Sequence, residues 1–91
     1  MNTYGIQLKE AELLITRDNI LAVSAEQQDN GEWAFFITFR NLTTGKTENV
    51  YIERQRQGMR TWADPRRMFD FMHDAFGITD GMFKIKPKRN N

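Results

Sequence analysis

Five arginines in the second half of the chain are the residues whose type and spacing most suggest chemistry. They are Arg54, Arg56, Arg60, Arg66 and Arg67. A guanidinium group is planar and always charged, and it can make two parallel hydrogen bonds to phosphate or carboxylate oxygens. The arginines therefore indicate a binding site for an anionic partner. The alternative is a solvated end of a sheet, where arginine stems pack on tryptophan faces.

Four aromatic side chains are candidates for stacking on bases or for docking a partner, two near these arginines (Trp33 and Trp62) and two on the sheet face away from the long helix (Phe36 and Tyr51). Nucleic acid is commonly bound by cations along its backbone and by aromatic rings against its bases. The combination favours nucleic acid or a nucleoprotein as partner, with a pure protein-interaction surface as the alternative.

Charge is divided unevenly along the chain. Residues 1–50 carry 4 basic and 7 acidic side chains, whereas residues 51–91 carry 9 basic and 5 acidic ones. Such asymmetry can mark the part of a protein that meets an anionic partner. Small domains also divide charge unevenly by chance, so both readings stay open.

The inventory of reactive side chains argues against catalysis. The chain has no cysteine, one histidine, His73, and one serine, Ser24. A nucleophile needs a base within hydrogen-bond reach, and a zinc site needs several cysteine or histidine ligands. No glycine-rich phosphate loop follows a predicted strand. The sequence therefore predicts that the protein is not an enzyme and has no catalytic residues, no metal site and no cofactor.

A β-hairpin is predicted over residues 20–40, with Asp29-Asn30-Gly31 between its strands at 20–28 and 33–40. A three-residue loop ending in Gly31 matches the apolar faces of the two strands, whereas a two-residue loop moves one apolar set to the wrong face. The favoured register sets Phe35 opposite Ala25, Ile37 opposite Val23 and Phe39 opposite Leu21.

A third strand is predicted over residues 47–56, after a turn at Thr44-Gly45, and a short fourth strand over 59–63, after a turn at Gln57-Gly58. If Thr43 pairs with Lys46, Val50 lies opposite Phe39 and Ile52 opposite Ile37. The same register puts Arg54 beside Phe35 and Arg56 beside Trp33. It therefore gathers arginines and tryptophans at one end of the sheet.

A helix is predicted from Pro65 to Phe76. Asp64 is a typical N-cap, proline suits the first helical position, and Gly77 can end the helix in the left-handed conformation. Its apolar residues share one face, and they are Met68, Phe69, Phe71, Met72, Ala75 and Phe76. A short amphipathic helix over residues 7–16 and a final strand with Phe83 and Ile85 complete the expected elements.

These elements predict one α+β domain over residues 1–86, followed by a basic polar tail at 87–91. The fold is a four-stranded antiparallel meander with the long helix on one face, a short N-terminal helix and a short C-terminal strand. The other face carries Phe36, Thr38, Arg40 and Tyr51. We expect the N-terminal helix to cover that face, because its own apolar residues also need burial. Left uncovered, the face is a mixed aromatic and polar platform for bases or for a partner.

No apolar run approaches the roughly 18 residues that a membrane span needs. Residues 1–10 lack the basic and apolar segments of a signal peptide. We therefore expect a cytoplasmic protein with no membrane partner. An exposed edge strand could also pair two copies into a homodimer.

The segment from Ile52 to Trp62 reads IERQRQGMRTW, and the predicted helix, Phe76-Gly77-Ile78 and Phe83 follow it. Upstream lie Ala22-Val23 and Glu32-Trp33. Over about residues 20–85 this pattern resembles small plasmid-encoded proteins described as ParC-like or partition-associated. The resemblance implies a non-catalytic accessory protein of a plasmid or other mobile genetic element. Together with the arginines, it predicts a DNA-binding or nucleoprotein-binding protein. The alternative is an adaptor or inhibitor of a host protein that binds no nucleic acid.

Overall fold

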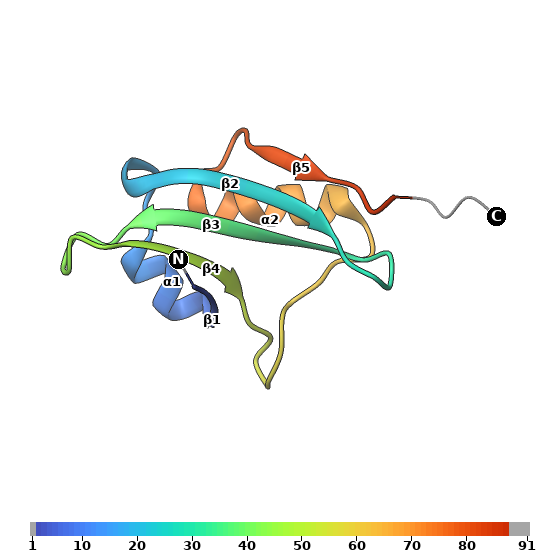
Figure 1. Ribbon diagram of the computed structural model, residues 1–91, viewed down its shortest axis with the longest axis horizontal. Helices are drawn as coiled ribbons and strands as arrows, with labels where there is room; N and C mark the ends of the chain where they lie inside the picture. The colour runs from blue at the N-terminus through green and yellow to red at the C-terminus, as the bar shows by residue number, and fades with distance from the viewer. Residues whose placement is uncertain (1, 88–91) are drawn as a thin grey trace.

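The computed structural model describes residues 2–87, which form two α-helices and one five-stranded sheet (Figure 1). In chain order the elements are β1 (Thr3–Ile6), α1 (Leu8–Leu14), the 3-10 turn η1 (Arg17–Asn19), β2 (Ile20–Gln27), β3 (Trp33–Arg40), β4 (Thr47–Ile52), α2 (Pro65–Phe76) and β5 (Met82–Lys84). The basic tail predicted at 87–91 lies outside the described residues, apart from Pro87.

The strands are ordered β1-β4-β3-β2-β5 across the sheet. The three central strands form an antiparallel meander, but β1 is parallel to β4 and β5 is parallel to β2. The α+β class is confirmed, whereas the four-stranded antiparallel meander is wrong. Residues 59–63 contribute only isolated bridges, because β1 occupies the edge of β4 that they would need. The Glu53 N–H, for example, donates to the Ile6 carbonyl at 2.9 Å.

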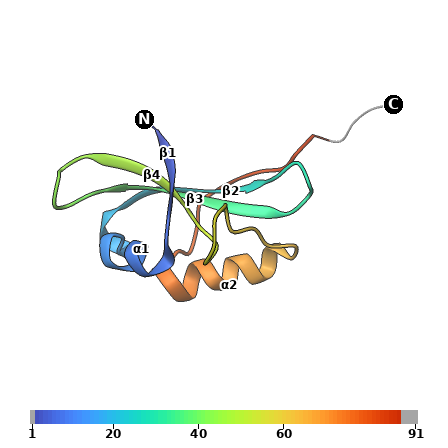
Figure 2. The same ribbon diagram turned by 90° about the horizontal axis from the view of Figure 1, so that it is seen from below.

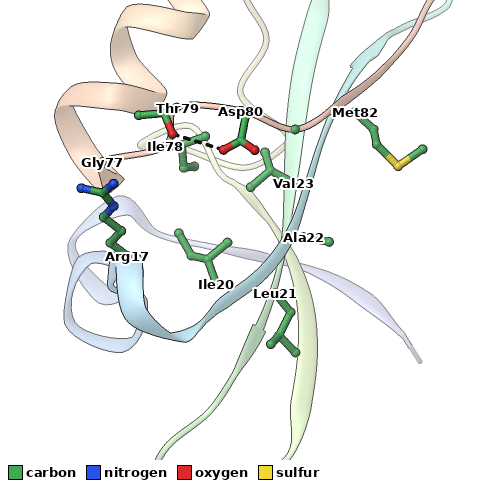
Figure 3. A pocket seen from close by; sticks show the side chains of 11 residues that line it. Arg17, Ile20, Leu21, Ala22, Val23, Gly77, Ile78, Thr79, Asp80 and Met82 are labelled. Atoms are coloured by element: carbon green, nitrogen blue, oxygen red, sulfur yellow. Dashed lines mark hydrogen bonds between the residues drawn. The ribbon is translucent and has the colours of Figure 1, made fainter.

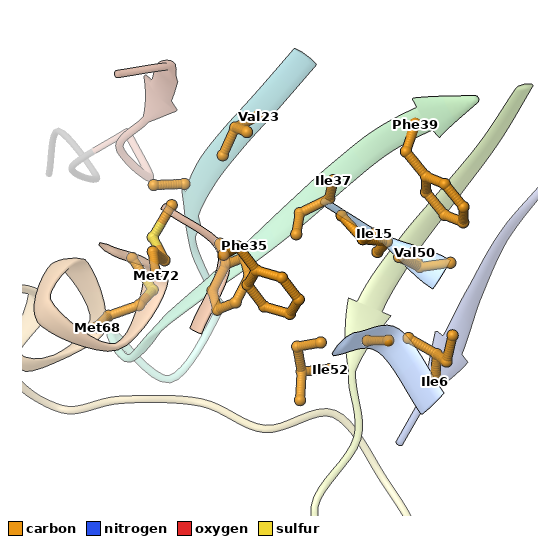
Figure 4. Packing of buried hydrophobic residues seen from close by; sticks show 13 residues of the cluster. Ile6, Ile15, Val23, Phe35, Ile37, Phe39, Val50, Ile52, Met68 and Met72 are labelled. Atoms are coloured by element: carbon orange, nitrogen blue, oxygen red, sulfur yellow. The ribbon is translucent and has the colours of Figure 1, made fainter. Parts of the chain in front are cut away.

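Both helices lie on the same face of the sheet (Figure 2). The hydrophobic core fills the space between the two layers (Figure 4). Its largest fully buried side chains are Phe35, Phe39, Ile37, Met68 and Val50. The expectation that the N-terminal helix covers the other face is therefore wrong. α1 follows directly after the parallel edge strand β1, and Ala11 within it and Ile15 just after it lie in the same core as α2.

The long helix α2 matches its predicted bounds, Pro65 to Phe76. The Asp64 side chain accepts a hydrogen bond from the Arg66 N–H, and Gly77 ends the helix at φ 68°. Met68, Met72 and Phe76 are buried, as predicted from the helical period. Phe69, which was predicted on the same apolar face, is instead 49% exposed. The ends of α2 could be predicted because their signals are local.

The first hairpin has the predicted three-residue loop. The Gln28 N–H donates to the Glu32 carbonyl at 2.7 Å, and Gly31 has φ +86°. Ala25 pairs with Phe35 and Val23 with Ile37, as predicted. The predicted pair of Phe39 with Leu21 is wrong, because the register shifts between residues 20 and 22. Ile20 pairs with Phe39 instead, and Leu21 is left 56% exposed.

The second hairpin is shifted by two residues from its predicted register. Val50 lies opposite Ile37, and Tyr51 lies opposite Phe36. The cause is Asn41, whose side-chain oxygen accepts the backbone N–H groups of Thr43 and Thr44 and so opens a longer loop. Because a shift of two keeps every side chain on its face, the apolar pattern survives. Since β4 ends at Ile52, Arg54 and Arg56 do not lie beside Phe35 and Trp33 as predicted.

Candidate anion-binding site

The five predicted arginines fall into two groups. Arg54, Arg56 and Arg60 belong to the segment 53–61 that leaves the sheet after β4, whereas Arg66 and Arg67 lie in the first turn of α2. The segment 53–61 passes close to α1, so it forms one wall of a hollow there.

This hollow, the arginine hollow, has a volume of about 950 Å³. Four cationic side chains line it, and they are Lys9, Arg54, Arg56 and Arg60. Glu12 and Glu53 line it as well, so its formal charge is positive by two. Neutral polar side chains make up much of the rest, and they are Gln7, Gln55, Gln57 and Thr61. Such a lining offers donors and charge suited to an oxyanion.

Arg54 is held in place by the turn that follows it. Its backbone N–H donates to the Gly58 carbonyl at 2.9 Å, and one of its guanidinium nitrogens donates to the Gln57 carbonyl at 3.0 Å. Gly58 has φ +107°, and a Cβ added there would lie 2.6 Å from Nη2 of Arg54. Gln7 donates to the Arg54 carbonyl from the other wall. A guanidinium group has five N–H donors, so most of those on Arg54 stay available to a ligand.

Arg60 is held in a different way, against aromatic rings. Its guanidinium carbon lies 4.8 Å from the ring centroid of Trp62 and 4.5 Å from that of Phe71. Its backbone N–H donates to the Ile52 carbonyl at 2.8 Å. The side chain is therefore fixed at the border between the arginine hollow and the core.

Arg66 is already paired. One of its guanidinium nitrogens lies 3.2 Å from Oδ2 of Asp64, and the same carboxylate caps α2. The hydrogen bonds from Arg66 lower the pKa of Asp64. Arg67 is exposed on the next position of the helix. The structure thus does not place these two arginines in the arginine hollow.

The four predicted aromatic residues are also divided, between the two faces of the sheet. Trp33 and Trp62 pack against the core on the helix side, where Trp62 lies 5.5 Å from Phe35 between ring centroids. Phe36 and Tyr51 lie on the uncovered face, edge to face at 6.2 Å. The two tryptophan rings are therefore less available for stacking on bases, whereas Phe36 and Tyr51 are half-buried on the face without helices.

The uncovered face is polar around its two aromatic rings. Thr38 donates to Asn49, which in turn donates to Thr3, each at 2.8 Å. Charges of both signs lie there, because Arg40 and Lys84 share the face with Glu26, and Glu53 lies at the border between this face and the arginine hollow. Both register and alternation place Arg40, Lys84 and Glu26 on it. The face is therefore not basic, in contrast to the arginine hollow.

Two features of the structure were not predicted from the sequence, a fourth cation in the arginine hollow and a second hollow elsewhere. Lys9 joins the arginines because β1 carries α1 alongside the segment 53–61, a non-local contact with no sequence signal. A second hollow, of about 380 Å³, lies between the start of β2 and residues 77–82 (Figure 3). Arg17 and Asp80 both line it, so their charges offset each other and it carries no comparable excess.

Comparison of the chain with protein-family models, with curated proteins and with solved structures finds no match. Neither α1 nor α2, the helices of residues 2–87, has the length and apolar composition needed to cross a membrane.

Proposed function

We propose that the protein is a non-catalytic nucleic-acid-binding module that holds phosphate groups in the arginine hollow. One observation carries the proposal: Arg54, Arg56 and Arg60 line a single hollow, and none of them forms an ion pair with another of residues 2–87. Arg66, in contrast, is already paired with the Asp64 carboxylate. Arginines that face a hollow without a carboxylate partner are instead available to an external anion.

The physical basis of binding is release of counterions from the nucleic acid. Each neutralised phosphate contributes a slope of roughly −0.9 to the logarithm of affinity against the logarithm of salt concentration on duplex DNA. We expect the four cations of the hollow to contact about three or four phosphates together, and Glu12 and Glu53 to oppose this binding. Affinity is therefore expected to fall steeply between low and physiological salt.

The resemblance to plasmid partition-associated proteins supports a role as an accessory protein of a plasmid or other mobile element. It makes DNA the first probe to use, with RNA of the same length beside it. A nucleoprotein partner would present the same phosphates, so binding of bare nucleic acid is the simplest readout.

The test is a salt series with labelled duplex DNA, single-stranded DNA and RNA. The double variant Arg54→Ala, Arg56→Ala should flatten the salt slope by about 2. The matched control is Arg17→Ala, Arg40→Ala, which removes the same charge from positions outside the arginine hollow. Both double variants should unfold near the wild-type denaturant midpoint, because exposed charges add little to stability. Absence of binding to every probe at low salt would refute the proposal, and equal slopes for the two double variants would refute the site.

A protein-interaction module is the second candidate, favoured by the uncovered sheet face. Phe36 and Tyr51 lie there with charges of both signs around them, which suits a protein surface better than a phosphate backbone. Such a module would act as an adaptor or an inhibitor of another protein. Phe36→Ala should then abolish capture of that protein and leave the salt slope on DNA unchanged.

A further inference from the structure

We propose that β5 pairs with β5 of a second copy of this chain, across a two-fold axis at Phe83. β5 has a neighbouring strand on one side only, β2. In Figure 1 it forms the upper border of the sheet, with none of the described elements beyond it. An uncovered strand edge offers unpaired backbone donors and acceptors to another strand.

Four large side chains at or beside this edge are apolar and exposed. Phe69 is 49% exposed, Met82 69%, Phe83 66% and Ile85 61%, and they make up half of the eight large exposed hydrophobic residues described. A groove of about 280 Å³ lies beside them between α2 and β5, lined in part by Met72 and Ile78. Scattered exposed apolar residues are ordinary, but residues gathered along one edge mark an interface.

The segment around Phe83 is complementary to itself when two copies run antiparallel with the phenylalanines opposite each other. The pairs are then Phe83 with Phe83, Met82 with Lys84, Gly81 with Ile85, and Asp80 with Lys86 of the other copy. Gly81 leaves room for the Ile85 side chain, and the Lys84 stem can lie along Met82. Because of the two-fold symmetry, every pair except Phe83 with Phe83 occurs twice in the dimer.

Charge favours this register over the one centred on Lys84. Centring the pair on Lys84 would set two lysines directly opposite each other, and like charges across a strand pair are destabilising. Centring on Phe83 sets Lys86 opposite Asp80 instead. In the single chain the Lys86 ammonium contacts the exposed Asp29 carboxylate. In the dimer Lys86 would contact the Asp80 carboxylate of the other copy, either in place of Asp29 or in addition to it. Pro87 lacks an N–H and ends the pairing segment at Lys86.

Phe83 points to the side of the sheet that carries the helices, where the apolar groove lies. Phe83 pairs with Ala25, whose side chain faces the core, so Phe83 points to the side that carries α2. The two-fold axis therefore brings both Phe83 rings and both apolar grooves together. The arginine hollows lie beside α1 on the β4 side of each sheet, away from the contact.

Cysteine cross-linking tests the register, because the chain has no cysteine of its own. Directly opposite residues in an antiparallel pair have Cα atoms about 4.5–5.5 Å apart, which is within disulfide range. Phe83→Cys should therefore form a covalent dimer under mild oxidation. Lys84→Cys should cross-link much more slowly, because the two residues 84 are offset along the strands. Leu42→Cys, at a site 76% exposed in the β3–β4 loop, measures random collision.

Sedimentation equilibrium tests the association itself. The wild type should show a monomer–dimer equilibrium, and Phe83→Asp should raise its dissociation constant by about tenfold or more. Leu42→Asp should leave it unchanged, and both variants should keep the wild-type circular dichroism because both side chains are mostly exposed. A wild type that is monomeric up to its solubility limit would overturn the proposal and leave this edge to a different protein. Equal cross-linking rates for the three cysteine variants would also overturn it. Phe83 does not line the arginine hollow. DNA binding by the Phe83→Asp variant therefore tests the proposed function independently of dimer formation.

Discussion

The guanidinium group of Arg60 lies over the Trp62 ring, 4.8 Å from its centroid, and also faces Phe71 at 4.5 Å. Phe71 comes from α2, whereas Trp62 comes from the connection that leads into it. Arg60 therefore packs against both the segment between β4 and α2 and the helix α2 itself, and it also lines the arginine hollow. It combines two roles that the sequence presents as alternatives, a stem packed on aromatic rings and a candidate anion contact.

Arg60→Ala is accordingly expected to lower stability as well as binding. Cation–π contacts contribute about 0.5–2 kcal/mol, depending on how far they are desolvated. Arg56→Ala is the matched control, because Arg56 lines the same hollow and is exposed. Urea unfolding should separate the two variants by about 1 kcal/mol, while both weaken DNA binding. Identical unfolding midpoints would show that the aromatic contacts of Arg60 do not contribute to folding.

The phase of α2 predicts a sharp contrast between neighbouring residues. Met72→Ala and Phe76→Ala remove buried side chains and should each cost about 2–5 kcal/mol. His73→Ala should cost under about 0.5 kcal/mol, because the His73 side chain is 66% exposed. Chemical denaturation of the three variants measures this directly. A similar loss for His73→Ala and Met72→Ala would contradict the helical phase.

The elements predicted correctly are those whose signals are local. Asp64, Pro65 and Gly77 set the ends of α2, and Gly31 sets the loop of the first hairpin. β1 could not be predicted in the same way, because its residues Thr3–Ile6 pair in parallel with a strand more than forty residues away. The structure shows why Gly5 suits this strand, because a Cβ there would lie 2.6 Å from the Glu53 side chain.

The position of the arginines depended on one side chain. Asn41 bonds to the N–H groups of Thr43 and Thr44, and the resulting loop moves β4 by two residues against β3. A shift of two residues leaves the alternation of apolar residues unchanged, so this pattern could not distinguish the two registers. With the observed register β4 ends before Arg54, so Arg54 and Arg56 lie near α1 rather than beside Phe35 and Trp33.

Gly58→Ala should weaken DNA binding through Arg54. Its φ of +107° is strained for alanine, and the added Cβ would lie 2.6 Å from Nη2 of Arg54. We expect a stability loss of about 1–3 kcal/mol together with displacement of the guanidinium group. Gly31→Ala is the control, because φ is +86° there and a Cβ would have no neighbour within 4 Å. Both variants should lose stability, but only Gly58→Ala should change the salt slope. Equal DNA binding by the two variants would show that the position of Arg54 is unimportant.

The edge strand β1 is tied to the sheet by a pH-sensitive contact. The Tyr4 hydroxyl donates a hydrogen bond to the Glu48 carboxylate, which also accepts one from Asn41. Partial burial and the bond to Glu48 raise the pKa of Tyr4 to about 12. The bonds from Tyr4 and Asn41 lower the pKa of Glu48. Each shift favours the pair of protonated tyrosine and ionised glutamate in the folded state.

The contribution of this pair to stability is therefore expected only within a pH window. The Tyr4 part is fully present below the unfolded value of about 10 and is lost as the pH rises through about 12. The Glu48 part is present above the unfolded value of about 4.3 and is lost as the pH falls through the lowered folded pKa. Absorbance titration of the Tyr51→Phe variant isolates Tyr4, the other tyrosine of the chain. Adding Glu48→Gln to that variant should move the Tyr4 pKa down toward 10, because the carboxylate that holds its proton is gone. An unchanged Tyr4 titration would show that β1 is not bound to β4 through this pair.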